Sequence, residues 1–319
     1  MKIKIAATII TVSLASGSLI AQNYPSKPVR ILAGGAGGGG DFAARLIAQG
    51  LSSTLGQQVV IDNRGGSVAV PAGQVAKAPA DGHMLLFFSA FVWLYPLLAD
   101  NVPYDPVRDL APITMAIMSP QMLVVHPSLQ VNSVKELIAL ARAKPGALNY
   151  ASAGNGTGSH LAAELFAAMA SVKIVRIGYR STGESVINLL TGQTQLMVAT
   201  APSVAPHVRS SRLRALAVTS AQPSALLPGL PTIASTGVPG YESITQWGMF
   251  APAKTPDAIV RLLNQETVRV LNRTDMKEKL LGAGVETVAS SPEELTAMIK
   301  AEMTRMGKVI RDAGIREQL

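Results

Sequence analysis

The chain has 319 residues, of which 48% are hydrophobic and 4% aromatic, and its formal net charge is +8 at pH 7. This length is enough for two domains of ordinary size, each with its own core. The basic residues are scattered and no aromatic residues are interleaved with them, which argues against a nucleic-acid partner. Because the chain has no cysteine, disulfides, thiol nucleophiles and thiolate metal sites are excluded.

The first 21 residues have the pattern of a secretory signal peptide. Lys2 and Lys4 make a basic start, residues 5–20 are uncharged and mostly apolar, and small residues crowd the end of the segment. We expect export and cleavage near Ala21. The alternative is a membrane anchor, but the apolar run is short and is diluted by Ser, Thr and Gly. No later stretch reaches the ~20 apolar residues that a membrane span needs.

The mature chain begins with a predicted strand, a glycine loop and a helix. Residues 29–32 are apolar, residues 37–40 are four consecutive glycines, and Asp41 is an N-cap or first-turn acid before a helical apolar pattern. Glycine lets backbone N–H groups approach a ligand, and a helix N-terminus attracts anions. The pattern predicts an anion site made of backbone amides; the alternative is a flexible turn.

The same loop permits a second interpretation. Residues 35–40 match G-x-G-x-x-G after a strand, and Asp62 ends the next predicted strand, residues 57–62. That arrangement is typical of dinucleotide binding, although the acid that would hold the ribose comes a little late. An oxidoreductase therefore stays open at this point.

Strands and helices alternate along the rest of the chain. Further strands are predicted at residues 84–88, 122–125, 149–152, 174–179, 195–199, 213–219 and 245–250, and helices at residues 72–78, 133–144, 161–170 and 186–190 and from residues 255, 274 and 291. This alternation predicts an α/β fold with largely parallel sheets and right-handed crossovers. Residues 89–93 are predicted to form a loop at the carboxyl end of a buried strand, where such folds place ligands.

A second glycine loop, residues 153–160, lies between a predicted strand and helix, and a third loop follows at residues 181–184. Two similar anion-binding loops far apart in sequence predict two α/β domains that face each other. The terminal helices have no strands of their own and should pack on the first domain. We therefore expect domain 1 to comprise residues 22–124 and 249–319, and an inserted domain 2 to comprise residues 125–248. The ligand site is expected in the cleft between them.

No catalytic or metal-binding pattern is found. The four histidines, His83, His126, His160 and His207, lack metal-ligand spacing, there is no G-x-S-x-G motif, and no acid pair stands out. His160 starts a helix beside the second glycine loop, where it is either a carboxylate contact or a structural residue. We expect a protein that is not an enzyme and needs neither cofactor nor metal.

Seven short motifs occur in order along the mature chain. They are Y-P-S-K-P-V-R at 24–30, G-G-G-G-D at 37–41, V-A-K-A-P-A-D-G at 75–82, P-Y-D-P with D-L-A-P-I at 103–113, N-Y-A-S-A-G-N-G-T at 149–157, L-R-A-L-A-V-T at 213–219 and F-A-P at 250–252. Each is weak alone, but the ordered set resembles the Bug family, the periplasmic substrate-binding proteins of tripartite tricarboxylate transporters.

The resemblance implies a type II-like, two-lobed Venus-flytrap protein in the periplasm, each lobe a mostly parallel sheet flanked by helices. Such a protein captures a small carboxylate, here a di- or tricarboxylate or an aromatic carboxylate, mainly through backbone amides. It acts as a monomer and delivers the ligand to the permease subunits of the transporter. Two alternatives are a ligand-sensing module for a two-component receptor and the dinucleotide-binding oxidoreductase, which the export signal and the second glycine loop oppose.

Departures from the family pattern bear on the ligand. Ala199 stands where the family often has an acid, and residues 89–93 are bulkier and more apolar than usual. We therefore hypothesise a ligand with an apolar or aromatic body next to Phe91 and Trp93; the alternative is that these two side chains fill the core. The predicted ligand-binding residues are Gly37, Gly38, Gly39, Gly40, Asp41, Ser89, Ala90, Phe91, Trp93, Ser152, Ala153, Asn155, Gly156, Thr157, His160, Arg180, Thr182 and Thr200.

Overall fold

The computed structural model describes residues 24–154, 157–224 and 227–312. The predicted signal peptide lies outside these residues, as do Asn155 and Gly156 of the second glycine loop. Among the helices that are described, none has the length and apolar character needed to cross a membrane.

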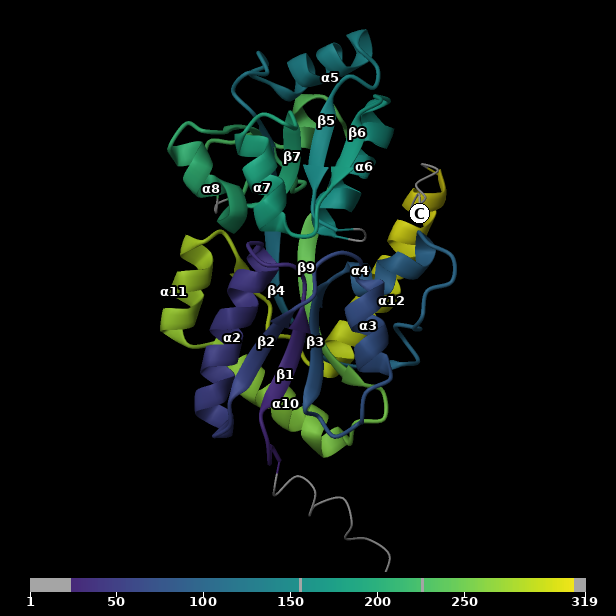
Figure 1. The fold of residues 1–319 in the computed structure, drawn as a ribbon, viewed down its shortest axis with the longest axis vertical. Helices are drawn as coiled ribbons and strands as arrows, with labels where there is room; N and C mark the ends of the chain where they lie inside the picture. The colour runs from purple at the N-terminus through teal and green to yellow at the C-terminus, as the bar shows by residue number, and fades with distance from the viewer. Residues whose placement is uncertain (1–23, 155–156, 225–226, 313–319) are drawn as a thin grey trace, which may run out of the picture.

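The molecule has two lobes (Figure 1). The strands of each lobe pair into a sheet, and one shared strand joins the two sheets into a continuous path of paired strands. In lobe 1 the strand order is β2 (Val59–Asn63), β1 (Val29–Ala33), β3 (Met84–Ser89), β9 (Ile244–Pro252) and the first part of β4 (Leu110–Val125), with β10 (Glu286–Thr287) also paired to β4. In lobe 2 the order is the last part of β4, β7 (Leu196–Thr200), β5 (Asn149–Ser152) and β6 (Val175–Gly178), with β8 (Arg214–Val218) also paired to β4.

Strand β4 runs through both sheets. It pairs with β9 as far as Pro120 and with β7 from Gln121. The sequence pattern predicted only its last four residues, because two prolines interrupt the earlier part. The predicted parallel pairs are present, since β1 is parallel to β2 and β3, and β5 to β6 and β7. Strands β4 and β9 add antiparallel pairs, so each sheet is mixed.

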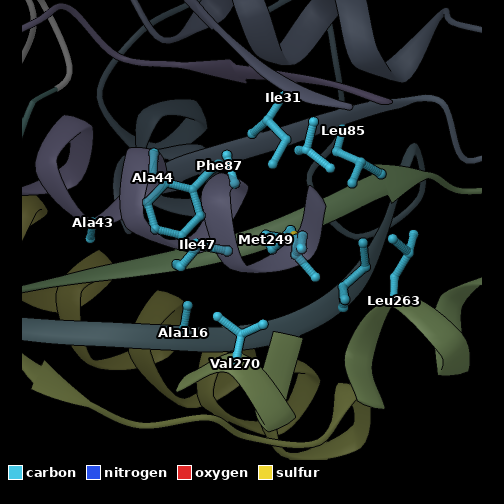
Figure 2. Close-up of a cluster of buried hydrophobic side chains, with 14 of the residues drawn as sticks. Ile31, Ala43, Ala44, Ile47, Leu85, Phe87, Ala116, Met249, Leu263 and Val270 are labelled. Carbon is cyan, nitrogen blue, oxygen red and sulfur yellow. The ribbon is translucent and has the colours of Figure 1, made fainter. Parts of the chain in front are cut away.

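Helices cover both faces of the lobe 1 sheet. Figure 2 shows one core, in which Ile47 of α2 (Gly39–Leu55) and Leu263 of α10 (Asp257–Leu271) pack towards Ile31, Leu85 and Met249 of the sheet. The second core lies under α3 (Ala69–Ala76), α4 (Phe91–Leu94), a 3-10 turn (Tyr95–Leu97) and α12 (Pro292–Asp312). Helix α11 (Thr274–Gly282) follows α10.

Lobe 2 contains α5 (Val134–Ala143), α6 (Gly158–Ala170), α7 (Thr182–Leu190), α8 (Ala201–Arg209) and α9 (Ile233–Thr236) around two further cores. The predicted third loop, residues 181–184, is the N-cap and first turn of α7. The predicted loop at residues 89–93 also needs correction, because the chain turns into helix α4 at Phe91. The division of the chain at residues 125 and 249 stays a prediction.

Candidate functional site

A cavity of about 80 Å³ lies between the two lobes. Both sheets and several helix starts contribute to its wall. The lining residues are Gly34, Gly35, Gly38, Gly39, Gly40, Asp41, Gly66, Phe87, Phe88, Ser89, Gln121, Ala153, Gly154, Thr157, Gly158, Ser159, Arg180, Thr182, Ala199, Thr200, Thr245 and Trp247.

Three helices begin at this cavity, and none of them has a side-chain N-cap. The N-cap residues are Gly38 for α2, Thr157 for α6 and Thr200 for α8. The first N–H groups of a helix have no partner within the helix, and the helix dipole places partial positive charge there. Helix α7 differs, because its N-cap Ser181 accepts a hydrogen bond from the Glu184 N–H. These helix ends make the cavity suited to an anion, although the first N–H group of α2, that of Gly39, is already bonded to Thr200 Oγ1.

Two charged residues stand on the wall, Asp41 and Arg180. The Asp41 carboxylate is already engaged: it accepts hydrogen bonds from Asn63 Nδ2 (2.9 Å) and the Gly37 N–H (3.2 Å), and Arg45 lies 3.1 Å away. Asp41 therefore holds the glycine loop in place. No acid among the described residues forms an ion pair with Arg180. The charge that is left uncompensated at the cavity is positive.

Three polar side chains of the wall were not predicted from the sequence: Ser159 at the start of α6, and Gln121 and Thr245. Gln121 is 1% exposed and Thr245 is 5% exposed, and neither Gln121 Oε1 nor Thr245 Oγ1 has a hydrogen-bond partner in the described part of the chain. A buried polar atom without a partner costs free energy, so a ligand that supplies one is favoured. No local pattern marks Gln121 and Thr245, because they lie where β4 and β9 pass between the lobes.

The apolar part of the wall comes from Phe87, Phe88 and Trp247. Gly40 lies directly against the last of these: a Cβ at Gly40 would be 2.3 Å from Trp247 Nε1. The missing side chain therefore lets the indole lie on the start of α2.

Glycines of both lobes also let the lobes come into close contact. The Gly66 N–H donates to the Arg180 carbonyl (3.1 Å), and the Gly183 N–H donates to the Ala36 carbonyl (3.2 Å). The Gly39 N–H donates to Thr200 Oγ1 (3.2 Å). From the sequence, the glycines were expected to bring backbone amides to a ligand, with a flexible turn as the alternative; close contact between the lobes is a further reason for them.

Ten of the predicted ligand residues line the cavity: Gly38, Gly39, Gly40, Asp41, Ser89, Ala153, Thr157, Arg180, Thr182 and Thr200. Six do not: Gly37, Ala90, Phe91, Trp93, Ser152 and His160. The other two, Asn155 and Gly156, lie outside the described residues. Ser152 sits behind the second glycine loop, where its Oγ accepts a hydrogen bond from Arg176 Nε (2.8 Å).

Phe91 and Trp93 belong to the second core of lobe 1, where they are 1% and 0% exposed. The Trp93 Nε1–H donates to Glu302 Oε2 of helix α12 (3.0 Å). The structure places both aromatic rings outside this cavity because α4 turns them under α12.

His160 is buried on α6, and its Nδ1 has no hydrogen-bond partner among the described residues. Burial, with a smaller contribution from the nearby Arg176 charge, lowers the His160 pKa from 6.5 to about 3. The side chain is therefore neutral near pH 7 and does not supply a positive charge to a carboxylate.

This shift predicts acid sensitivity. Between pH 6.5 and 3 the unfolded chain binds a proton at His160 that the folded chain does not, so stability falls as the pH falls, by up to ~1.4 kcal/mol per pH unit. In His160→Leu this contribution disappears. Urea unfolding at pH 7 and pH 4.5 should show a smaller loss of stability for the variant than for the wild type; an equal loss would contradict the assignment.

The two lobes and the anion-suited cavity between them define a solute-binding protein of the two-lobed periplasmic type. Residues 43–315 match the model of the tripartite tricarboxylate transporter family receptor, and the chain belongs to this family. The family predicted from the ordered motifs is thereby confirmed.

Two sequence relatives cover most of the chain. It is 37% identical to the UPF0065 protein in the tcbD-tcbE intergenic region of Pseudomonas sp. (strain P51), over 94% of this chain and 91% of that one. It is 33% identical to Protein BugT of Bordetella pertussis, over 92% of this chain and 91% of that one.

Three solved structures are also similar. R. palustris Rpa4515 with adipate has a TM-score of 0.88 at 36% identity, covering 92% of this chain and 99% of that one. The periplasmic binding protein BugD has a TM-score of 0.89 at 30% identity, covering 92% and 100%. MatC from Rhodopseudomonas palustris with bound malate has a TM-score of 0.86 at 26% identity, covering 90% and 100%.

The dinucleotide interpretation finds no support in these comparisons. Asp62, the acid that it requires at the ribose, does not line the cavity and is ion-paired with Arg64 at 2.8 Å.

Proposed function

We propose that this protein captures a small carboxylate in the cavity between its lobes. The observation that carries the proposal is the convergence of three helix N-termini, none capped by the side chain of its own N-cap residue, on a cavity where Arg180 is the charged residue without an ion pair among the described lining residues. Each helix end contributes roughly 0.3–1 kcal/mol to an exposed negative charge and up to ~2 kcal/mol when the charge is partly buried. Hydrogen bonds to a charged group add about 1.5–3 kcal/mol each. Micromolar affinity needs about −8 kcal/mol, which these contributions can reach after association costs.

The similar structures support the same class of ligand. Rpa4515 is described with adipate and MatC with malate, and both ligands are carboxylates. In this proposal Gln121 and Thr245, whose buried oxygens lack partners among the described residues, hydrogen-bond the ligand, and Phe87, Phe88 and Trp247 cover its apolar part.

The protein acts, in this proposal, in the periplasm after removal of the signal peptide near Ala21. It divides into residues 22–124 with 249–319 and an inserted domain of residues 125–248, which close on the ligand and bind the permease subunits of a tripartite tricarboxylate-type transporter as a monomer. It performs no catalysis. A sensor kinase is the alternative partner.

Thermal unfolding of the chain from Gln22 onward tests the ligand class, after denaturation and refolding to remove co-purified ligand. The panel holds aliphatic mono-, di- and tricarboxylates, aromatic carboxylates, amino acids and NAD. A ligand at ~100 times its dissociation constant adds about 2.7 kcal/mol of stability, which raises the unfolding temperature by several degrees. We expect shifts with carboxylates and none with NAD. A shift with NAD alone, or a flat panel, would overturn the proposal.

A further inference from the structure

A second, smaller pocket of about 30 Å³ adjoins the carboxylate cavity. Three residues, Ser89, Gly158 and Thr245, line both spaces and so form the partition between them. Gly158 starts α6 in lobe 2, whereas Ser89 and Thr245 lie at the ends of β3 and β9 in lobe 1. The partition is therefore a contact between the two lobes.

The partition is also thin. A Cβ at Gly158 would lie 2.6 Å from Thr245 Oγ1, so only the absence of a side chain keeps these two residues from colliding. Thr245 lines both spaces, and its Oγ1 is buried and has no hydrogen-bond partner in the described chain. A ligand held in the main cavity thus lies next to the side pocket.

Much of the wall of the side pocket is apolar. Helices α4 and α6 contribute most of this apolar part, and β9 and α12 complete the enclosure; the main apolar side chains are Phe91, Leu94, Leu161, Leu165, Ile244 and Met306. Burying hydrocarbon against such walls is favourable by roughly fourfold in affinity per methylene group.

The charges at the side pocket disfavour a second carboxylate. Two acids line it, Glu242 and Glu302, together with one cation, Arg305. Arg305 lies 3.8 Å from Glu302, whose other oxygen accepts the hydrogen bond from Trp93. The cation is therefore already shared with an acid, and a ligand carboxylate here would meet like charge.

We propose that the side pocket is a subsite for an uncharged apolar tail, so that the preferred ligand is a monocarboxylate with a short hydrocarbon chain. This proposal rests on the proposed function, because the carboxylate end stays at the helix N-termini of the main cavity. The apolar body hypothesised for the ligand lies in this proposal beside Phe91, and Trp93 contributes only through its hydrogen bond to Glu302.

Calorimetric titration with unbranched monocarboxylates from acetate to octanoate tests the subsite. Adipate is compared with hexanoate, because it has the same number of carbon atoms and a second carboxylate. Affinity should rise about fourfold per methylene and then stop rising once the pocket is full. Hexanoate should bind at least about tenfold tighter than adipate. Affinity that is independent of chain length, or adipate binding as well as hexanoate, would overturn the subsite.

Two variants test whether the apolar wall and the acids of the side pocket cause these differences in affinity. Met306→Ala enlarges the pocket and should move the best chain length upward. Glu242→Gln removes one acid at a half-buried position and should narrow the gap between hexanoate and adipate. If Met306→Ala leaves the best chain length unchanged and Glu242→Gln leaves the gap between hexanoate and adipate unchanged, the subsite is refuted even if wild-type chain-length dependence is seen. If no carboxylate of any length binds, the proposed function itself fails, which is a different result.

Discussion

Gly154→Ala should weaken carboxylate binding by about tenfold to a hundredfold while leaving both lobes folded. In the closed arrangement a Cβ at this position would lie 1.8 Å from the Gly66 carbonyl oxygen, and 2.3 Å from its carbon. The obstacle is backbone, which cannot rotate away like a side chain, and overpacking of this kind costs roughly 1–3 kcal/mol or more. The cost falls on the closed form alone, because Gly66 belongs to lobe 1 and Gly154 to lobe 2.

Titration calorimetry with the most stabilising carboxylate measures this loss, and small-angle scattering shows whether the ligand still contracts the molecule. Gly65→Ala should act in the same way, since its Cβ would lie 2.2 Å from the Arg180 carbonyl oxygen. Gly282→Ala is the matched control: it lies in helix α11, and no atom stands within 4 Å of the added methyl group. The carboxylate affinity of Gly282→Ala should equal that of the wild type, and its free energy of unfolding should be slightly higher. Wild-type affinity in Gly154→Ala would show that ligand capture does not need this lobe contact.

Trp93→Ala should lower the free energy of unfolding by ~3–5 kcal/mol without changing which short carboxylates are preferred. The indole is fully buried in the second core of lobe 1, and its truncation leaves both a cavity and an unpaired Glu302 oxygen. The residue does not line the main cavity, so the contacts to a carboxylate that ends there are retained.

Urea unfolding measures the stability, and titration with short carboxylates measures the preference. Trp93→Phe is the informative partner variant, because it keeps most of the buried area and removes the hydrogen bond to Glu302, at a cost of about 1–3 kcal/mol. If a Trp93 variant is as stable as the wild type but binds the short carboxylates in a different order of affinity, Trp93 contacts the ligand and this prediction is wrong.

Much of the site's chemistry could be predicted from residues that are close together in the sequence. A short apolar strand, a run of glycines and an amphipathic helix predict an exposed helix N-terminus whatever surrounds it, because backbone geometry is local. For this reason Gly38, Gly39, Gly40, Thr157 and Thr200 were expected at the ligand and line the cavity. The ordered motifs also predicted the family and the two-lobed fold.

Other features depended on packing between distant segments. The predicted loop after β3 became helix α4, since α12, some 200 residues later, covers its aromatic rings. Gln121 and Thr245 entered the site only because β4 and β9 pass side by side between the two sheets.

By itself, the sequence determined the α/β alternation, the two glycine loops and the helix ends that favour an anion, because turn geometry and the helix dipole depend on neighbouring residues. Only the tertiary structure decided that Gly65 and Gly154 serve contact between the lobes, that Phe91 lies at a side pocket and that Trp93 lies in the core. Such roles depend on which residues from distant parts of the sequence contact these positions. Close packing between remote segments leaves no pattern in the local sequence.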